Sequence, residues 1–174
     1  MLRAILLPLA LLLSLLAAPA RAEVLVTFWS HAQDRNYPHA FLVMRGTVDA
    51  TGQRVDDNIG FTARSVSPAI LIQSVNGRMD RVSAAYMARP TSRPHFSLRL
   101  NDTQYAALQA FIARWRAQAQ PSYNLNDRNC VHFVMEAAAL LGLTVNRRSA
   151  HFLDPPDFLD EVMRLNPQLV AARR

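Results

Sequence analysis

Residues 122–142 read SYNLNDRNCVHFVMEAAALLG and contain the transition that decides the fold. The first part is a polar loop rich in asparagine. The second part predicts a helix that begins near Cys130 and stops at Gly142. Its apolar residues share one helical face: Val131, Val134, Ala138 and Leu141. The stretch therefore predicts a polar loop that leads into an apolar helix, with the cysteine at the start of that helix.

The chain before this helix is rich in β-branched and aromatic residues. We expect strands over residues 23–30, 39–48, 54–63, 68–75 and 95–100, with a strand or a short helix over residues 78–88. Strands of this kind, joined by short turns, predict an antiparallel sheet.

The chain after residue 100 has helical spacing. We expect a helix from a cap at Asn101 or Asp102 to near Gln120, and a last helix over residues 158–165 capped by Asp157. Strands followed by helices indicate an α+β fold, with the antiparallel sheet packed against helices. Residues 23–174 are enough for a single domain with a core of its own.

The first 22 residues have the pattern of a secretory signal peptide. Arg3 precedes an apolar run, and Ala20-Arg21-Ala22 offers the small residues that a signal peptidase recognises. We expect cleavage after Ala22, export to the periplasm or the medium, and no stable membrane span after cleavage. An uncleaved N-terminal anchor is the alternative.

Charge and composition exclude several classes of partner. The net charge is +6, yet every basic residue is an arginine and the arginines are spread along the chain, so we expect no nucleic-acid partner. One cysteine and scattered histidines lack the spacing of metal ligands, so we expect neither a metal site nor a cofactor.

The lone cysteine is the first candidate for chemistry. An exported protein with one cysteine has no internal disulfide, so the thiol is either buried or retained for a reaction. At the start of a helix, free N–H groups and the helix dipole favour a thiolate. Cys130 is therefore a candidate nucleophile, and a buried cysteine that happens to open a helix is the alternative.

A cysteine nucleophile needs a histidine nearby in space. Of the five histidines, His39 follows a polar loop and opens an apolar strand, which places its ring at the end of the sheet. His132 comes two positions after Cys130, about 200° around a helix, so it points away from the thiol. We therefore expect His39 to be the general base and His132 to be structural.

These residues match a known pattern. The segment Asn129-Cys130-Val131-His132-Phe133-Val134 resembles the N-C-x-H-F-V box of the lecithin:retinol acyltransferase-like family and its permuted papain-like relatives. Those relatives include PPPDE peptidases and bacterial NlpC-type hydrolases. The segment from Pro38 to Val43 resembles their first motif, and the histidine precedes the cysteine, which is the permuted order. The resemblance spans about residues 24–143 and implies a permuted papain-like (NlpC-type) fold with Cys130 as nucleophile and His39 as base.

The family takes a third polar residue from the strand beside the histidine. A hairpin turn at Thr51-Gly52 places a position near residue 64 opposite His39, with Thr62 and Ser65 close by. None of these is the histidine that the acyltransferase branch uses. Thr62 is therefore a candidate orienting residue, and a Cys–His dyad is the alternative.

The expected activity is acyl transfer through a thioester. We expect an exported cysteine hydrolase that cleaves an amide or ester bond in a cell-envelope peptide or lipid. The backbone N–H of Cys130 would hold the oxyanion, with help from Tyr123 or Asn129. The alternatives are a lipid acyltransferase and a catalytically inert exported domain that binds a partner through the same groove.

Overall fold

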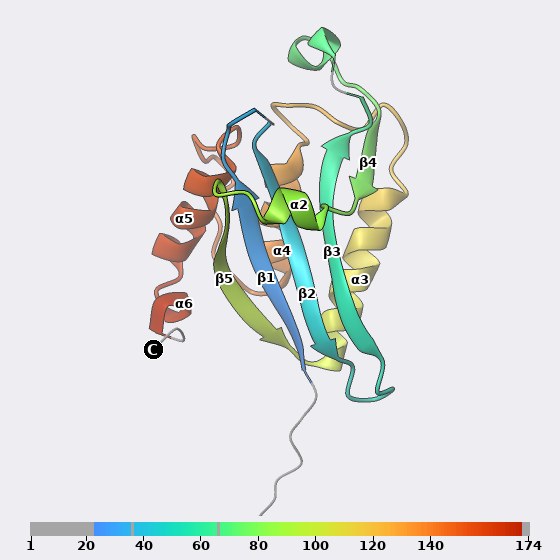
Figure 1. The fold of residues 1–174 in the computed structure, drawn as a ribbon, viewed down its shortest axis with the longest axis vertical. Coiled ribbons are helices and arrows are strands. Elements are labelled where there is room, and N and C mark those ends of the chain that lie inside the picture. Colours follow the sequence, from blue (N-terminus) through green and yellow to red (C-terminus); the bar gives the residue numbers. More distant parts are fainter. Residues whose placement is uncertain (1–22, 36, 66, 172–174) are drawn as a thin grey trace, which may run out of the picture.

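The computed structural model describes residues 23–171 apart from residues 36 and 66, so the predicted signal peptide lies outside the described residues. Figure 1 shows the elements in chain order. They are β1 Val24–His31, β2 His39–Thr47, β3 Arg54–Ala63, the 3₁₀ turn η1 Pro68–Leu71, β4 Gly77–Asp80, α2 Ala84–Met87, β5 Ser92–Leu100, α3 Asp102–Arg116, α4 Cys130–Leu140, α5 Pro155–Leu165 and α6 Gln168–Ala171.

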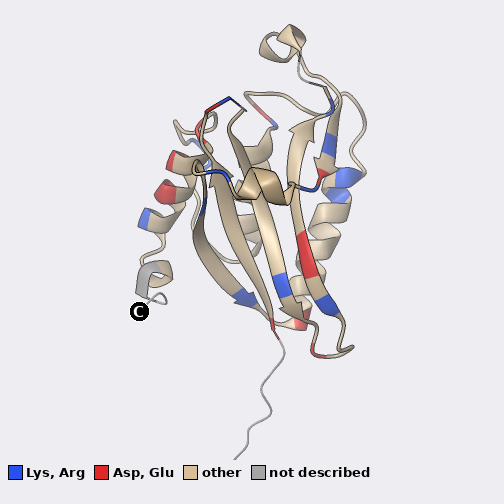
Figure 2. Cartoon of the chain, viewed as in Figure 1, with Lys and Arg blue, Asp and Glu red and all other residues tan. Residues whose placement is uncertain are grey.

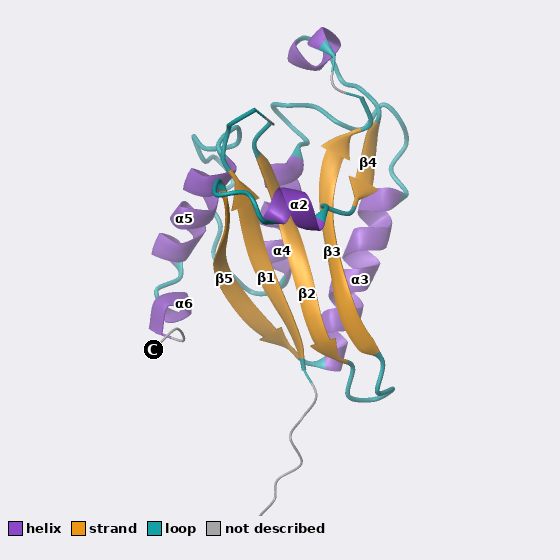
Figure 3. Ribbon diagram, viewed as in Figure 1, coloured by secondary structure: helices purple, strands orange, loops and turns teal. Residues whose placement is uncertain are grey.

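The strands form one antiparallel sheet in the order β4-β3-β2-β1-β5. Figure 3 shows the strands as one layer with the longer helices beside it. The predicted α+β class and antiparallel sheet are therefore confirmed.

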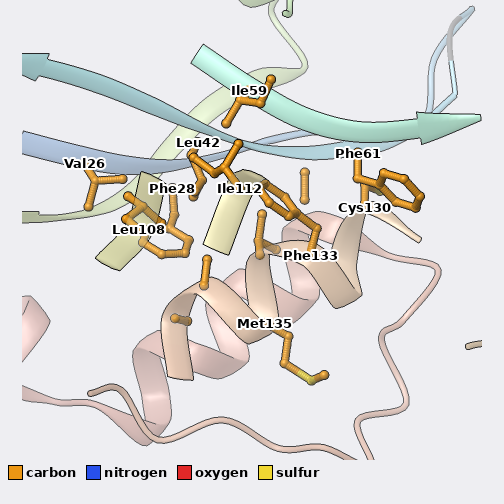
Figure 4. Packing of buried hydrophobic residues seen from close by; sticks show 14 of the residues in the cluster. Val26, Phe28, Leu42, Ile59, Phe61, Leu108, Ile112, Cys130, Phe133 and Met135 are labelled. Carbon is orange, nitrogen blue, oxygen red and sulfur yellow. The ribbon is translucent and has the colours of Figure 1, made fainter. Parts of the chain in front are cut away.

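One face of the sheet packs against α3, α4 and α5. Alternate residues along each strand point to that face, and they include Val26, Phe28 and Leu42. Figure 4 shows them packed with side chains from the helices, such as Ile112 and Phe133. Burial of this continuous apolar layer is the main source of stability in the fold.

The opposite face carries α2, which lies in front of the sheet in Figure 1. The alternate residues of β1 and β2 point here, and Phe41 is fully buried against Trp29 at a ring distance of 6.1 Å. The ring of Tyr86 of α2 contacts the ring of His31 in a tilted arrangement, with centroids 4.2 Å apart. His39 belongs to this set of residues, so its ring lies on the side of α2 whereas α4 packs on the other side.

Two helix boundaries differ from the prediction. Asp154, rather than Asp157, caps α5: its carboxylate accepts a hydrogen bond from the Asp157 N–H at 3.3 Å. Pro155 fits the first turn because a proline there sacrifices no intrahelical bond. Helix α3 begins after the predicted cap Asn101 but ends at Arg116, several residues before the predicted end near Gln120.

The predicted strand over residues 68–75 is wrong. Pro68 opens the 3₁₀ turn η1, and Leu71 and Ile72 are exposed rather than packed in the sheet. A proline has no N–H for a strand ladder. The edge strand is instead β4, so the ambiguous stretch over 78–88 contains both the end of a strand and the short helix α2.

Charges of both signs are scattered over strands and helices in Figure 2. Within the described residues, no helix is long and apolar enough to cross a membrane. The same residues include no group of three or more histidine, cysteine, aspartate or glutamate side chains placed to hold a metal ion.

Candidate active site

The start of α4 is fixed by Asn129. Its side-chain oxygen accepts hydrogen bonds from the N–H groups of Val131 at 2.8 Å and His132 at 3.2 Å. Its amide nitrogen donates to the carbonyls of Leu125 at 2.7 Å and Phe152 at 2.8 Å. This cap ties the first turn of α4 to the preceding loop and to the loop before α5. With both ends of its amide engaged, Asn129 positions Cys130 and is not free to bind an oxyanion.

The sulfur of Cys130 lies in an almost closed environment. The residue is 5% exposed, and the backbone N–H groups of Ala40, Val131 and Cys130 itself lie near the sulfur, where they favour its anion. Burial raises the pKa of the thiol to about 11, and the three N–H groups only partly oppose this effect. The expected preference for a thiolate is therefore wrong for this structure, because loss of solvent outweighs the helix terminus.

His39 opens β2 as predicted and stands opposite His31 of β1. Its ring stacks on Phe41 at 5.8 Å and meets the edge of Tyr86 at 6.5 Å. Burial and the neighbouring His31 lower the pKa of His39 to about 4, although Asp80 acts in the opposite direction. The resting pair is thus a neutral thiol and a neutral imidazole.

Cys130 and His39 line the same cavity, which has a volume of about 570 Å³. The cavity is walled by the loop before β2, the end of β3, η1, residues 80–86, the loop before α4 and residues 152–155. Both candidate residues border the start of β2: the sulfur of Cys130 lies near the N–H of Ala40, whereas the ring of His39 lies on the other face of the sheet.

The three other predicted site residues, Asn129, Thr62 and Tyr123, also line this cavity. The β2–β3 register pairs Phe41 with Gly60, which places Thr62, rather than residue 64, opposite His39. The hydroxyl of Tyr123 has no hydrogen-bond partner among the described residues, and burial raises its pKa. Tyr123 is therefore a better candidate oxyanion donor than Asn129.

His132 has the structural position that its spacing predicts. Its Nδ1 accepts a hydrogen bond from the Asn129 N–H at 3.3 Å, which completes the capping box of α4. Its ring stacks on Phe152 at 4.4 Å. These contacts stabilise the loops around Asn129 and Phe152, which form part of the cavity wall.

The sequence analysis missed three residues at or beside the cavity: Asp80 and Tyr86, whose side chains line it, and Gly60, which lies beside His39. A Cβ at position 60 would lie 2.5 Å from Nε2 of His39. The ring of His39 therefore occupies the space that a side chain at position 60 would fill, and this space is called the gap at Gly60. Tyr86 donates a hydrogen bond to the carbonyl of Tyr37 at 3.0 Å and so joins α2 to the loop before β2. No local sequence signal marks these residues, because their roles depend on cross-strand register.

No protein-family model, curated protein or solved structure has a significant match to this chain. The resemblance to permuted papain-like proteins therefore stays a prediction from the two motifs.

Proposed function

We propose that this protein is an exported cysteine hydrolase with a permuted papain-like fold, which cleaves an amide or ester bond in a cell-envelope substrate. Cys130 is the nucleophile and His39 the general base. The observation that supports this proposal most is the shared cavity, with the sulfur at the start of a helix and the imidazole at the start of a strand.

The proposed reaction starts from two neutral groups. The thiol proton passes through the shared cavity to His39, and we assign Nδ1 as the acceptor because the Nε2 edge lies over Gly60. The sulfur forms a bond to the substrate carbonyl carbon, and the carbonyl oxygen becomes an oxyanion that the N–H of Cys130 and the hydroxyl of Tyr123 can stabilise.

The tetrahedral intermediate collapses when the bond from carbon to the amine or alcohol breaks, and the leaving group takes its proton from His39. Water then attacks the thioester, gives one proton to His39 and releases a carboxylic acid. The sulfur regains its proton from the imidazolium, so the cycle ends on the neutral pair.

Hydrolysis of p-nitrophenyl acetate and of alanine p-nitroanilide by the purified protein tests this proposal. We expect Cys130→Ala to abolish activity with the fold retained, and mass spectrometry of quenched wild-type protein to find an acyl group on Cys130. Activity that survives in Cys130→Ala would overturn the assignment. A folded wild-type protein that is neither active nor acylated would instead indicate the inert binding domain.

A lipid acyl substrate is a second candidate, favoured by the rim of the cavity. Three apolar lining residues are largely exposed: Tyr37 is 65% exposed, Leu71 72% and Leu153 59%. Large exposed apolar groups that surround a cavity are typical of a binding surface. With p-nitrophenyl esters of increasing chain length, an acyl site predicts a KM that falls from acetate to octanoate. A peptide site predicts no such trend.

A further inference from the structure

The ring of His39 lies across β3 at Gly60. A Cβ at this position would be 2.5 Å from Nε2 and 3.0 Å from Cε1 of the ring. Real Cβ atoms do not approach a ring so closely, so the absence of a side chain at position 60 is what allows this ring position. The Nε2 edge of His39 is consequently directed over β3, on the side of the sheet that faces α2.

Asp80 stands on the far side of this gap. Gly60 pairs with Phe41 of β2 on one side and with Asp80 of β4 on the other. Cross-strand partners direct their side chains to the same face, and His39 shares that face because it precedes Phe41 by two residues. Asp80 also lines the cavity that contains His39. At position 60 this row has no side chain between β2 and β4.

We propose that Asp80 is the positioning residue for His39: across the gap at Gly60, its carboxylate favours a proton on Nε2 and leaves Nδ1 free to accept the proton of Cys130. This inference rests on the proposed function, and it supplies the third polar group that the sequence left unassigned. Thr62 lies opposite His39 but carries no charge with which to stabilise the imidazolium.

The position of the carboxylate is itself fixed. Arg78 donates to one oxygen of Asp80 at 2.7 Å, and the backbone N–H of Arg81 donates to the other at 3.0 Å. Both contacts come from residues within two positions of Asp80, so they fix its side chain locally at the end of β4.

The other titratable groups around His39 act differently. His31 faces it from β1 and lowers its pKa, whereas Asp80 raises that pKa. Tyr86 from α2 and Cys130 from α4 are neutral in the resting state, since the pKa of each is raised. Asp80 is thus the anion that opposes burial of the imidazolium which forms during the reaction.

The imidazole ¹⁵N chemical shifts of His39, measured at pH 7 and assigned with His39→Gln, test the pairing without any substrate. We expect mainly the Nε2–H tautomer in the wild type and a redistribution toward Nδ1–H in Asp80→Asn. Asp56→Asn is the matched control, because Asp56 is an exposed aspartate of the same sheet that pairs with Arg45 outside the cavity. An unchanged tautomer population in Asp80→Asn overturns the inference.

Hydrolysis of p-nitrophenyl acetate gives the second test. We expect Asp80→Asn to lower kcat at least about tenfold with little change in KM, and Asp80→Glu to recover much of the loss. A full kcat in Asp80→Asn overturns the role of Asp80. If the wild type shows no hydrolysis that depends on Cys130 while the tautomer still responds to Asp80→Asn, the proposed function fails and the pairing stands.

Discussion

His31 and His39 lie directly opposite one another where β1 and β2 pair. His31 is fully buried and is held by Asp34 at 3.2 Å and Ser92 at 2.8 Å. A positive charge on His39 would therefore have to form at a partly buried position beside a second imidazole, which is costly. This arrangement keeps His39 in the form that can accept a proton.

The same arrangement predicts a pH dependence of stability. The pKa of His39 is about 4 in the folded protein against 6.5 in the unfolded chain, so only the unfolded chain takes up this proton between these values. Stability should fall as the pH falls through this window, by up to roughly 3 kcal/mol at its lower end. Urea unfolding at several pH values measures it. His39→Gln should flatten the slope, whereas His151→Gln, outside the cavity, should not. An unchanged slope in His39→Gln contradicts this account.

Gly60→Ala should displace the ring of His39. The added Cβ would meet Nε2 at 2.5 Å and the Cβ of Phe41 at 3.1 Å, so the ring must turn away. We expect at least about a tenfold loss of hydrolysis, with a cost in stability of roughly 1–3 kcal/mol. Activity per folded molecule, from enzyme assays and urea unfolding, separates the two effects.

Gly52→Ala is the control for that variant. Its φ is +67° and nothing lies within 4 Å of the added Cβ, so it should cost about 1 kcal/mol from backbone strain and leave activity intact. Equal activity in Gly60→Ala and Gly52→Ala would show that the gap at Gly60 is not needed by the site.

Asn129→Ala should loosen the start of α4. The substitution removes the side-chain oxygen that accepts from the first two free N–H groups of α4. It also removes the amide nitrogen that donates to the carbonyls of Leu125 and Phe152. We expect a loss of roughly 2–4 kcal/mol in the free energy of unfolding, measured in urea. Asn129→Asp keeps the capping oxygen but loses both donors, so its loss should be smaller than that of Asn129→Ala. The reverse order would show that the two carbonyl contacts matter more than the cap.

Ser30, His95 and Asp160 form a second hydrogen-bonded set, which has the residue types of a catalytic triad. Ser30 bonds to Nε2 of His95 at 2.7 Å, and Nδ1 of His95 bonds to Asp160 at 2.8 Å. Ser30 is fully buried, His95 is 1% exposed, and neither lines the cavity. These contacts join β1 and β5 to α5 and give a serine no access to a substrate.

A fluorophosphonate that modifies activated serines should therefore leave Ser30 unlabelled in the folded protein, as judged by peptide mass spectrometry. His95→Phe should lower stability by roughly 1–3 kcal/mol, since it removes a buried hydrogen bond to Ser30 and a partly buried one to Asp160. Labelling of Ser30 under native conditions, absent in His95→Phe, would reveal a second active site.

Local signals predicted much of this fold. Alternation and β-branched residues placed β3 at its observed bounds, and polar caps placed the starts of α3 and α4. The pattern failed over residues 68–75, where an apolar run beginning with a proline projects from the sheet instead of joining it.

Local signals also located two residues of the candidate site. Cys130 and His39 stand at element boundaries that sequence patterns mark, and both line the cavity. The approach of His39 to Gly60 and Asp80 depends on the registers of β2, β3 and the four-residue β4, which no local pattern encodes. The direction of the thiol pKa was also wrong, since burial is a property of the whole packing.

The order of the two candidate residues along the chain has a consequence for when the proposed site forms during folding. His39 is in the second strand, whereas Cys130 follows the whole sheet and α3. A nascent or partly unfolded chain therefore has a thiol with neither base nor cavity beside it. Under the proposed function, completion of the fold is the activation step, because only the folded chain brings Cys130 and His39 to one cavity.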